Sequence, residues 1–439
     1  MINFLTISST ISIFIIYIIF WFNPTFSIYS LLAVRASIGF LRDLKISFLG
    51  YELSFLGIFS LFVCFLGIIY ILVKKANIKN NFFIFYTLFC VWCLISIGYS
   101  IDKHASIPDF LRVFSPIMFY ILIFNEIKQK THINNLIWVI ILSCLVPIFY
   151  GFYQYITHTG FIKHGILRIN STFMYPNLFG AYLYLIALMT VNQIVLTKKR
   201  IIKIFLFFIL GITLFSLILT GTRTSFVSFL IGFIIYIFLT SRKKYIFFVL
   251  PIICLALLTQ STIRERLFQP FESSLTLHKK HSEYITIKSN VLNKRERFKG
   301  NTWKWRTWYW KQVLKTYFRK PILGYGIGTS ILAVQKTLHI NANYPHNDYL
   351  RLLLEVGIFG FFLYIISFGV LLHDFIHFFL NSMNREYKSC YAVSIAIIIS
   401  FLAMIIASNR ITANTLLWYF FAIIAITYSI RNNEIVEKV

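Results

Sequence analysis

Charged residues are scarce in this sequence of 439 residues. Asp, Glu, Lys and Arg make up 13% of it, against about 25% in an ordinary soluble domain. Apolar residues reach 58%, and runs of about 20 of them, long enough to cross a bilayer, recur along nearly the whole chain. The alternating segments of an outer-membrane barrel are not seen. We therefore expect an all-α integral membrane protein that forms one polytopic domain over residues 1–439.

Acidic residues are the scarcest of the charged ones. Fifteen Asp and Glu face 42 Lys and Arg, which gives a formal net charge of +27. Such an excess of positive charge favours binding to nucleic acid, to anionic lipid or to an anionic substrate. Nucleic acid is the least expected of these for a membrane protein, so we expect no nucleic-acid partner.

Cysteine clusters and cofactor motifs are also missing. All six cysteines lie in or at the ends of apolar segments, and the C-x-x-C of Cys90 and Cys93 falls inside one, where packed thiols are favoured over a redox or metal site. The sequence has no Walker motif, no H-E-x-x-H and no external D-x-D. Gly324-x-Gly326-x-Gly328 lacks the strand and helix of a nucleotide loop and predicts a turn. We expect no metal and no cofactor.

About twelve segments are predicted to span the membrane. The first is predicted to be retained, because it lacks a basic n-region and a small-residue cleavage site. Residues 26–50 carry Arg35, Arg42 and Lys45, which predicts a loop or an interfacial helix. The spans are 4–22, 53–73, 82–99, 111–125, 135–156, 176–196, 202–220, 225–240, 245–260, 349–372, 391–408 and 413–430.

Short basic loops orient these spans. Lysines and arginines follow the second, fourth, sixth, eighth and tenth spans, and such loops face the cytoplasm. Both termini are then cytoplasmic, whereas loop 23–52 and the large loop 261–348 are external. The second half of the large loop is rich in Trp and Tyr, which predicts helices that fold back to the membrane interface.

Five residues that could carry chemistry are predicted to face the exterior: Arg168, Arg223, Arg306, His346 and Arg410. An arginine at the end of a span can reach lipid phosphates, or its fork can bind a diphosphate held at the membrane surface. The sequence leaves both interpretations open for Arg223 and Arg306. His346 opens the tenth span, where a neutral imidazole is a suitable general base at pH 7.

Three charged residues follow His346 on one helical face. Asp348, Arg351 and Glu355 are spaced i, i+3 and i+7, which predicts a ladder of charge pairs with Asp348 at the favourable helix N-terminus. Charges this deep are costly unless they face the bundle interior. A structural role is therefore favoured for these three residues.

The string Y-P-H-N-D-Y-L-R-L-L-L-E-V-G-I-F-G at residues 344–360 resembles the H-N-x-x-L…E-x-G-x-x-G signature of the O-antigen ligase and O-antigen polymerase superfamily. Three further pieces occur in the order that the family uses. Gly221-Thr-Arg223-Thr-Ser resembles its T-x-S/T-R turn.

The other two pieces flank this turn in the sequence. Arg306-Thr-Trp-Tyr-Trp, with the turn 321–328, resembles the family's R-x-x-x-W…P-x-x-G-x-G-x-G stretch. Arg168 with residues 171–177 resembles its F-x-N-P-N segment, although Tyr175 stands at a usually polar position.

The resemblance implies a metal-independent, inverting glycosyltransferase of the GT-C type. Its donor is a glycan on undecaprenyl diphosphate, its acceptor is a second glycan or the lipid A core, and membrane lipids and a chain-length regulator are further partners. Carried over to this sequence, Arg223 and Arg306, together with Arg168, bind the diphosphate, and His346 activates the acceptor hydroxyl. The supporting residues are Asn177, Asn347, Glu355 and Arg410.

The acceptor separates two activities within this family. The Y-P-H-N-D-Y-L-R form favours a polymerase, which extends a glycan on the next lipid-linked unit, and the alternative is a ligase, which transfers the finished glycan to the lipid A core. A transporter or flippase would place functional charge within repeat-related spans, and the sequence shows no internal symmetry. In a scaffolding protein, Arg223 and His346 would be freely replaceable.

Overall fold

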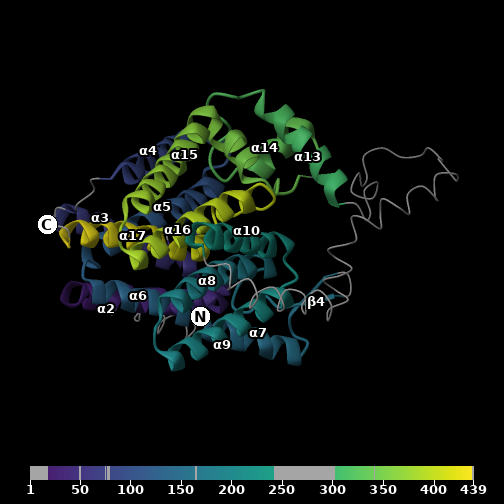
Figure 1. Cartoon of the computed structure of the whole chain (residues 1–439). Coiled ribbons are helices and arrows are strands. Elements are labelled where there is room, and N and C mark those ends of the chain that lie inside the picture. Colours follow the sequence, from purple (N-terminus) through teal and green to yellow (C-terminus); the bar gives the residue numbers. More distant parts are fainter. Residues whose placement is uncertain are drawn as a thin grey trace.

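The computed structural model describes residues 18–48, 51–74, 76, 80–163, 166–241, 302–340 and 342–437. Most of the first predicted span, the whole of the ninth and the first part of the large loop lie outside these residues. Figure 1 shows a bundle of long helices with α13 and α14 at one end of it.

Helices dominate the described part of the chain. Between the helices lie a 3-10 helix (Ser37–Asp43) and two short antiparallel hairpins. The hairpins are β1 (Lys45–Phe48) with β2 (Tyr51–Ser54), and β3 (Phe161–Lys163) with β4 (Ile166–Arg168). The helices are α2 (Pro24–Arg35), α3 (Phe55–Lys74), α4 (Asn81–Gly98), α5 (Lys103–Glu126), α6 (Lys130–Leu142), α7 (Leu145–Ile156), α8 (Pro176–Leu196), α9 (Arg200–Leu219), α10 (Arg223–Thr240), α13 (Thr302–Tyr317), α14 (Ser330–Leu338), α15 (Asp348–Asn381), α16 (Arg385–Ile405) and α17 (Asn414–Val436).

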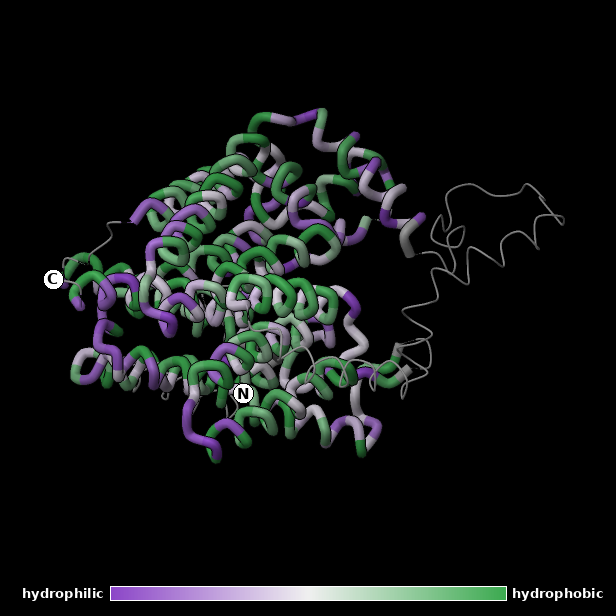
Figure 2. Tube along the Cα trace, viewed as in Figure 1, coloured by the Kyte–Doolittle hydropathy of each residue, from purple (hydrophilic) through white to green (hydrophobic). Residues whose placement is uncertain are grey.

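Nine candidate membrane spans occur among the described residues, by length and composition. The prediction of an all-α, multi-pass membrane protein is confirmed, whereas the count of twelve is not. The predicted span 135–156 is two helices, α6 and α7, that meet at Ser143 and Cys144. α17 is almost entirely buried from Leu416 to Ile430 and is not one of the nine. Figure 2 shows hydrophobic residues along most helices and hydrophilic residues mainly near their ends.

One end of the bundle, here called the basic end, collects the short lysine- and arginine-rich loops. Lys74 at the end of α3 and Lys128 after α5 line one cavity. Lys130 Nζ lies 3.8 Å from a carboxylate oxygen of Glu437, just beyond α17, and over the ring of Tyr387 on α16. Since α3, α5 and α17 all finish there, their first residues lie at the opposite end, here called the site end.

Residues 24–35 correct the prediction of a loop or an interfacial helix. They form α2, which packs against α5, α6 and α17. Arg35, counted as a loop charge in the sequence, is only 2% exposed. Its guanidinium donates to Asn414 Oδ1 at 3.0 Å and lies 5.7 Å and 5.4 Å from the ring centres of Phe59 and Trp418. The aromatic faces and the amide offset part of the cost of burying this charge.

The position of α2 also differs from the predicted topology. Thr25, near its first residue, lines the same cavity as Lys74 and Lys128. Ala36, just beyond its last residue, accepts a hydrogen bond from Thr172 close to the start of α8. α2 therefore runs from the basic end to the site end, where the sequence had predicted an external loop 23–52.

Candidate functional site

The first turns of α8, α10, α15 and α17 come together at the site end. Arg410, in the loop before α17, donates from Nη2 to the Asn177 carbonyl of α8 at 3.0 Å, and its backbone N–H donates to Asp348 of α15. Arg168 joins Asn177 to Thr222, which precedes α10. Each helix N-terminus carries partial positive charge, so their convergence favours an anion.

Arg168 ties three segments together. It is 7% exposed, and its Nε donates to the Thr220 carbonyl at 2.7 Å. Its Nη2 donates to Asn177 Oδ1 at 2.8 Å and to Thr222 Oγ1 at 3.2 Å. These contacts connect the end of β4 to α8 and to the turn that presents Arg223.

The turn before α10 needs both a glycine and close packing. Gly221 has φ of 58°, a left-handed conformation that glycine adopts at little cost. A Cβ on Gly180 of α8 would lie 3.1 Å from atoms of Thr220 and Thr222, so α8 approaches the turn closely. Arg223 follows as the first residue of α10 and is half-buried.

Arg410 is buried in the loop between α16 and α17, with 5% of its surface exposed. Burial lowers its pKa to about 10, against the attraction of the Asp348 carboxylate. The guanidinium therefore keeps its proton at neutral pH. The Asp348 carboxylate also accepts from the Ile411 N–H at 3.1 Å, which fixes this loop on the first turn of α15.

α13, in the large loop, supplies a further arginine to the site end. Arg306 Nη1 donates to the Ala407 carbonyl at 3.3 Å, in the same loop that carries Arg410. Partial burial lowers the pKa of Arg306. Trp305, its neighbour, places its ring 6.4 Å from the His346 imidazole, edge to face. Helix α13 therefore brings Arg306 and His346 into one neighbourhood.

His346 lies directly before the N-cap of α15 in a left-handed conformation, with φ of 51°. That conformation costs roughly 1–2 kcal/mol for an L-residue, and hydrogen bonds on both sides hold it. Trp310 Nε1 donates to the Pro345 carbonyl at 2.8 Å, and Asn347 Oδ1 accepts from the Leu350 N–H at 3.1 Å. The half-buried imidazole is thus fixed by its backbone.

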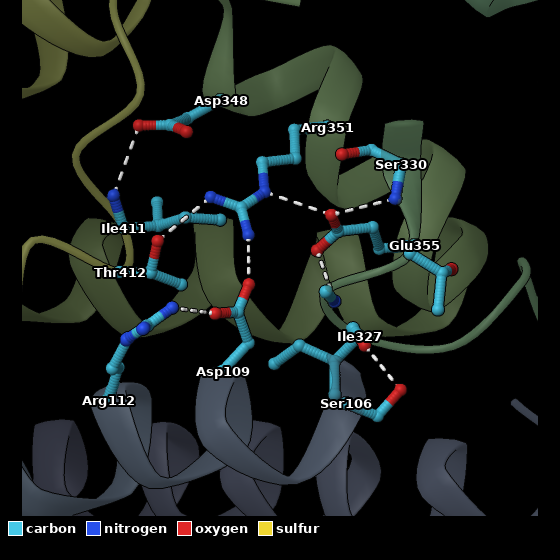
Figure 3. A network of polar contacts seen from close by, with 12 residues as sticks. Ser106, Asp109, Arg112, Ile327, Ser330, Asp348, Arg351, Glu355, Ile411 and Thr412 are labelled. Atoms are coloured by element: carbon cyan, nitrogen blue, oxygen red, sulfur yellow. Dashed lines mark hydrogen bonds and ion pairs between the residues drawn. The ribbon is translucent and has the colours of Figure 1, made fainter. Parts of the chain in front are cut away.

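A buried network of charges, drawn in Figure 3, lies beneath this first turn. Arg351 is 1% exposed. It contacts Asp109 of α5 through Nη2 at 2.5 Å, Glu355 through Nε at 2.9 Å and Thr412 through Nη1 at 2.9 Å. Asp109 also pairs with Arg112, whose side chain is 49% exposed. Arg351 therefore joins α5, α15 and the loop of Arg410.

Glu355 connects this network to the glycine-rich turn 321–328. Its Oε2 accepts from the Gly328 N–H at 2.9 Å, and its Oε1 accepts from the Ser330 N–H at 3.2 Å, at the start of α14. The Arg351–Glu355 step of the predicted ladder is present. The Asp348 carboxylate instead accepts hydrogen bonds from the backbone N–H groups of Arg410 and Ile411.

The same turn docks into a break in α15. Gly357 has φ of 67° and ψ of −171°, which interrupts the helix. The Leu354 and Glu355 carbonyls accept from the N–H groups of Tyr325 and Gly326 at 3.0 Å and 2.8 Å, and the Ile358 N–H donates to the Pro321 carbonyl at 2.9 Å. The glycine-rich turn 321–328 and the segment of α15 that contains Gly357 therefore pack against each other.

Four of the predicted site residues, Arg168, Asn177, Arg306 and Arg410, are joined by hydrogen bonds at the site end. Hydrogen bonds connect Arg168, Asn177, Arg410 and Asp348 in that order, and Arg306 reaches the same loop. Within the described ranges, no group of three or more His, Cys, Asp and Glu residues is arranged to hold a metal ion.

Sequence reasoning missed Asp109, Arg112 and Thr412. Asp109 stands two residues before the predicted span 111–125, although it belongs to the helix Lys103–Glu126. A carboxylate at the edge of an apolar segment is the signal that could have found it, because such a charge needs a partner when its helix packs inside the bundle.

The fold and the site define a multi-pass membrane protein with an arginine-rich site beside a histidine. Residues 206–365 match the family model described as O-Antigen ligase. A relative from Rickettsia typhi is 26% identical over 314 residues, 69% of this chain and 71% of its own length. Another, from Rickettsia prowazekii, is 24% identical over 401 residues, 83% and 89% of the two lengths. Both carry the provisional name polysaccharide ligase. These matches support the resemblance of the chain to the O-antigen ligase and polymerase superfamily.

Proposed function

We propose that this protein is an inverting glycosyltransferase that moves a glycan from undecaprenyl diphosphate to an acceptor hydroxyl at the site end. The observation that carries the proposal is the convergence of four helix N-termini and the arginines 168, 306 and 410 on the segment of His346. Fixed positive charge of this kind suits a departing diphosphate.

The reaction needs one proton acceptor and one anion site. The acceptor hydroxyl gives its proton to the His346 imidazole, and its oxygen forms a bond to the anomeric carbon of the donor sugar. The anomeric carbon–oxygen bond to the diphosphate breaks at the same time, with inversion. Arg223 and Arg306 neutralise the negative charge that the diphosphate gains, so no metal is needed for this step.

The site end is proposed to face the exterior of the cytoplasmic membrane, with the C-terminal end of α17 in the cytoplasm. The basic loops gather at the opposite end of the bundle, and short basic loops stay on the cytoplasmic side. Undecaprenyl-diphosphate-linked glycans displayed on the outer leaflet would then reach the arginines directly.

Of the two activities in this family, we now favour the ligase. The names of the Rickettsia relatives support a ligase, and the acceptor would be the lipid A core. The polymerase remains the second candidate because of the Y-P-H-N-D-Y-L-R form of residues 344–351, and its acceptor would be the next lipid-linked unit.

The test is a gel of surface and lipid-linked glycans from a strain that lacks the gene, restored with wild type or His346→Ala. Long chains that accumulate on undecaprenyl diphosphate without reaching the core identify a ligase. Single units on the core without long chains identify a polymerase. A glycan profile unchanged by deletion contradicts the proposal, and a His346→Ala protein that inserts normally yet restores transfer removes the general base.

A further inference from the structure

A polar cavity of about 520 Å³ opens at the basic end, between α2, α3, α5 and the start of α6. It lies at the opposite end of the bundle from His346 and the arginines. The glycosyl transfer proposed above makes no use of it.

The walls of the cavity carry charges of both signs. Lys74 and Lys128 are exposed on its lining, and neither takes part in an ion pair among the described residues. Glu126 is half-buried on the same lining, and its Oε1 accepts a hydrogen bond from the Tyr70 hydroxyl at 2.5 Å. Tyr70 therefore holds the carboxylate in place, and among the described residues no hydrogen bond to its second oxygen is found.

The ends of the surrounding helices set the depth of the cavity. The membrane-spanning helix α3 ends at Lys74, and α5 ends at Glu126. Apolar helices end where hydrocarbon gives way to headgroups, so the cavity lies at the level of the lipid headgroups. Basic pockets between transmembrane helices on the cytoplasmic side are a known form of lipid headgroup site.

We infer that this cavity binds the phosphoethanolamine headgroup of a membrane phospholipid. Lys74 and Lys128 contact the phosphate, and Glu126 accepts hydrogen bonds from the ammonium group. A phosphatidylglycerol headgroup lacks a cation for Glu126. A phosphatidylcholine headgroup has a cation without N–H donors, so it cannot hydrogen-bond to the carboxylate.

The test uses the purified full-length protein in detergent with added phosphatidylethanolamine, phosphatidylglycerol or phosphatidylcholine, and measures retained lipid by native mass spectrometry. The wild type should retain phosphatidylethanolamine about two- to fivefold better than the other two lipids, which is the worth of one exposed ion pair. Equal retention of the three lipids would overturn the inference.

Two variants assign the contacts. Glu126→Gln should remove the preference for phosphatidylethanolamine and leave phosphatidylglycerol bound at least as well as before. Lys74→Gln with Lys128→Gln should weaken the binding of both lipids about 30-fold, since each lysine near an anionic surface contributes about 1 kcal/mol. The matched control is Lys198→Gln with Lys199→Gln, two lysines between α8 and α9 outside the cavity.

Two further results would also contradict the inference. In one, the cavity double variant behaves like the control double variant. In the other, soluble glycerophosphoethanolamine displaces the lipid at equal concentration, which would mean that the site takes a free phosphate ester and not a membrane lipid. Glycosyl transfer by the Glu126→Gln variant is expected to remain near wild type, so this test stands apart from that of the proposed function.

Discussion

Hydrogen bonds on both sides of His346 hold its backbone. Its left-handed conformation costs roughly 1–2 kcal/mol, and Trp310 and Asn347 fix the residues on either side of it. Such strain is tolerated where a side chain must point in one direction. We infer that the fold places this imidazole in advance, so that the acceptor hydroxyl meets an oriented base.

Arg223 and Arg306 are predicted to act through two-pronged hydrogen bonds from their guanidinium groups to the diphosphate. Alanine at either position should lower the rate of transfer by about 100- to 1,000-fold, the cost of removing one preorganised charge donor. Lysine should lower it less, because the charge stays and the two-pronged contact is lost. Initial rates in a purified transfer assay measure both effects.

The matched control is Arg319→Ala, an exposed arginine just beyond α13, which should leave the rate near wild type. If lysine and alanine were equally harmful at both positions, charge would not be the property that matters. If Arg319→Ala were as harmful as the other changes, the effect would reflect loss of net positive charge and not specific contacts.

At the scale of elements, the break in α15 is what joins the two glycine motifs. A Cβ on Gly357 would lie 2.1 Å from the Ile322 carbonyl oxygen. The carbonyls freed by the break bind the turn 321–328, and Glu355 binds the end of the same turn. The first turn of α15, with His346 before it, therefore depends on a helix that is interrupted two turns further on.

Gly357→Ala is expected to destabilise the protein by more than about 1 kcal/mol, because alanine is strained at positive φ and collides with the turn. Gly369→Ala is the control in the same helix, since a Cβ there meets nothing within 4 Å. Gly369→Ala should be neutral or stabilising by up to about 1 kcal/mol. Thermal unfolding in detergent measures both, and equal shifts would contradict the packing described for Gly357.

The buried charge network gives a second prediction at this scale. Asp109→Asn leaves Arg351 with a weakened partner in the interior, and breaking a buried pair costs about 3–5 kcal/mol. Expression and unfolding temperature should fall clearly. Glu386→Gln, an exposed carboxylate at the basic end, is the control and should change little. A stable Asp109→Asn protein would show that Glu355 alone satisfies Arg351.

For the whole molecule, the sequence predicted the class of protein and the family motifs, because hydrophobic runs and motif spacing are local properties. It missed α2 as a helix of the bundle, because Arg35 looks like a loop charge until Phe59, Trp418 and Asn414 surround it. It missed Asp109 because its partner Arg351 lies 242 positions away. Partners separated this far become visible only in the folded chain.

The orientation of the molecule is open to a direct check. A cysteine at Arg319 marks the site end, and a cysteine at Lys198 marks the basic end. A membrane-impermeant maleimide applied to cells with a permeable outer envelope should label the first and not the second. Among the described residues the native cysteines are buried or half-buried, so their background is low. The reverse labelling pattern would place the site end in the cytoplasm.

The central claim is that His346 and its arginines transfer a glycan from a polyprenyl diphosphate. The most direct measurement is release of undecaprenyl diphosphate by the purified protein in lipid nanodiscs, given a glycan-loaded donor and, in separate reactions, a lipid A core or a second lipid-linked unit. The account predicts release that needs an acceptor and falls by about 100- to 10,000-fold in His346→Ala, the contribution of one general base at an otherwise intact site. Release by the His346→Ala protein at the wild-type rate, or no release with either acceptor, would contradict it.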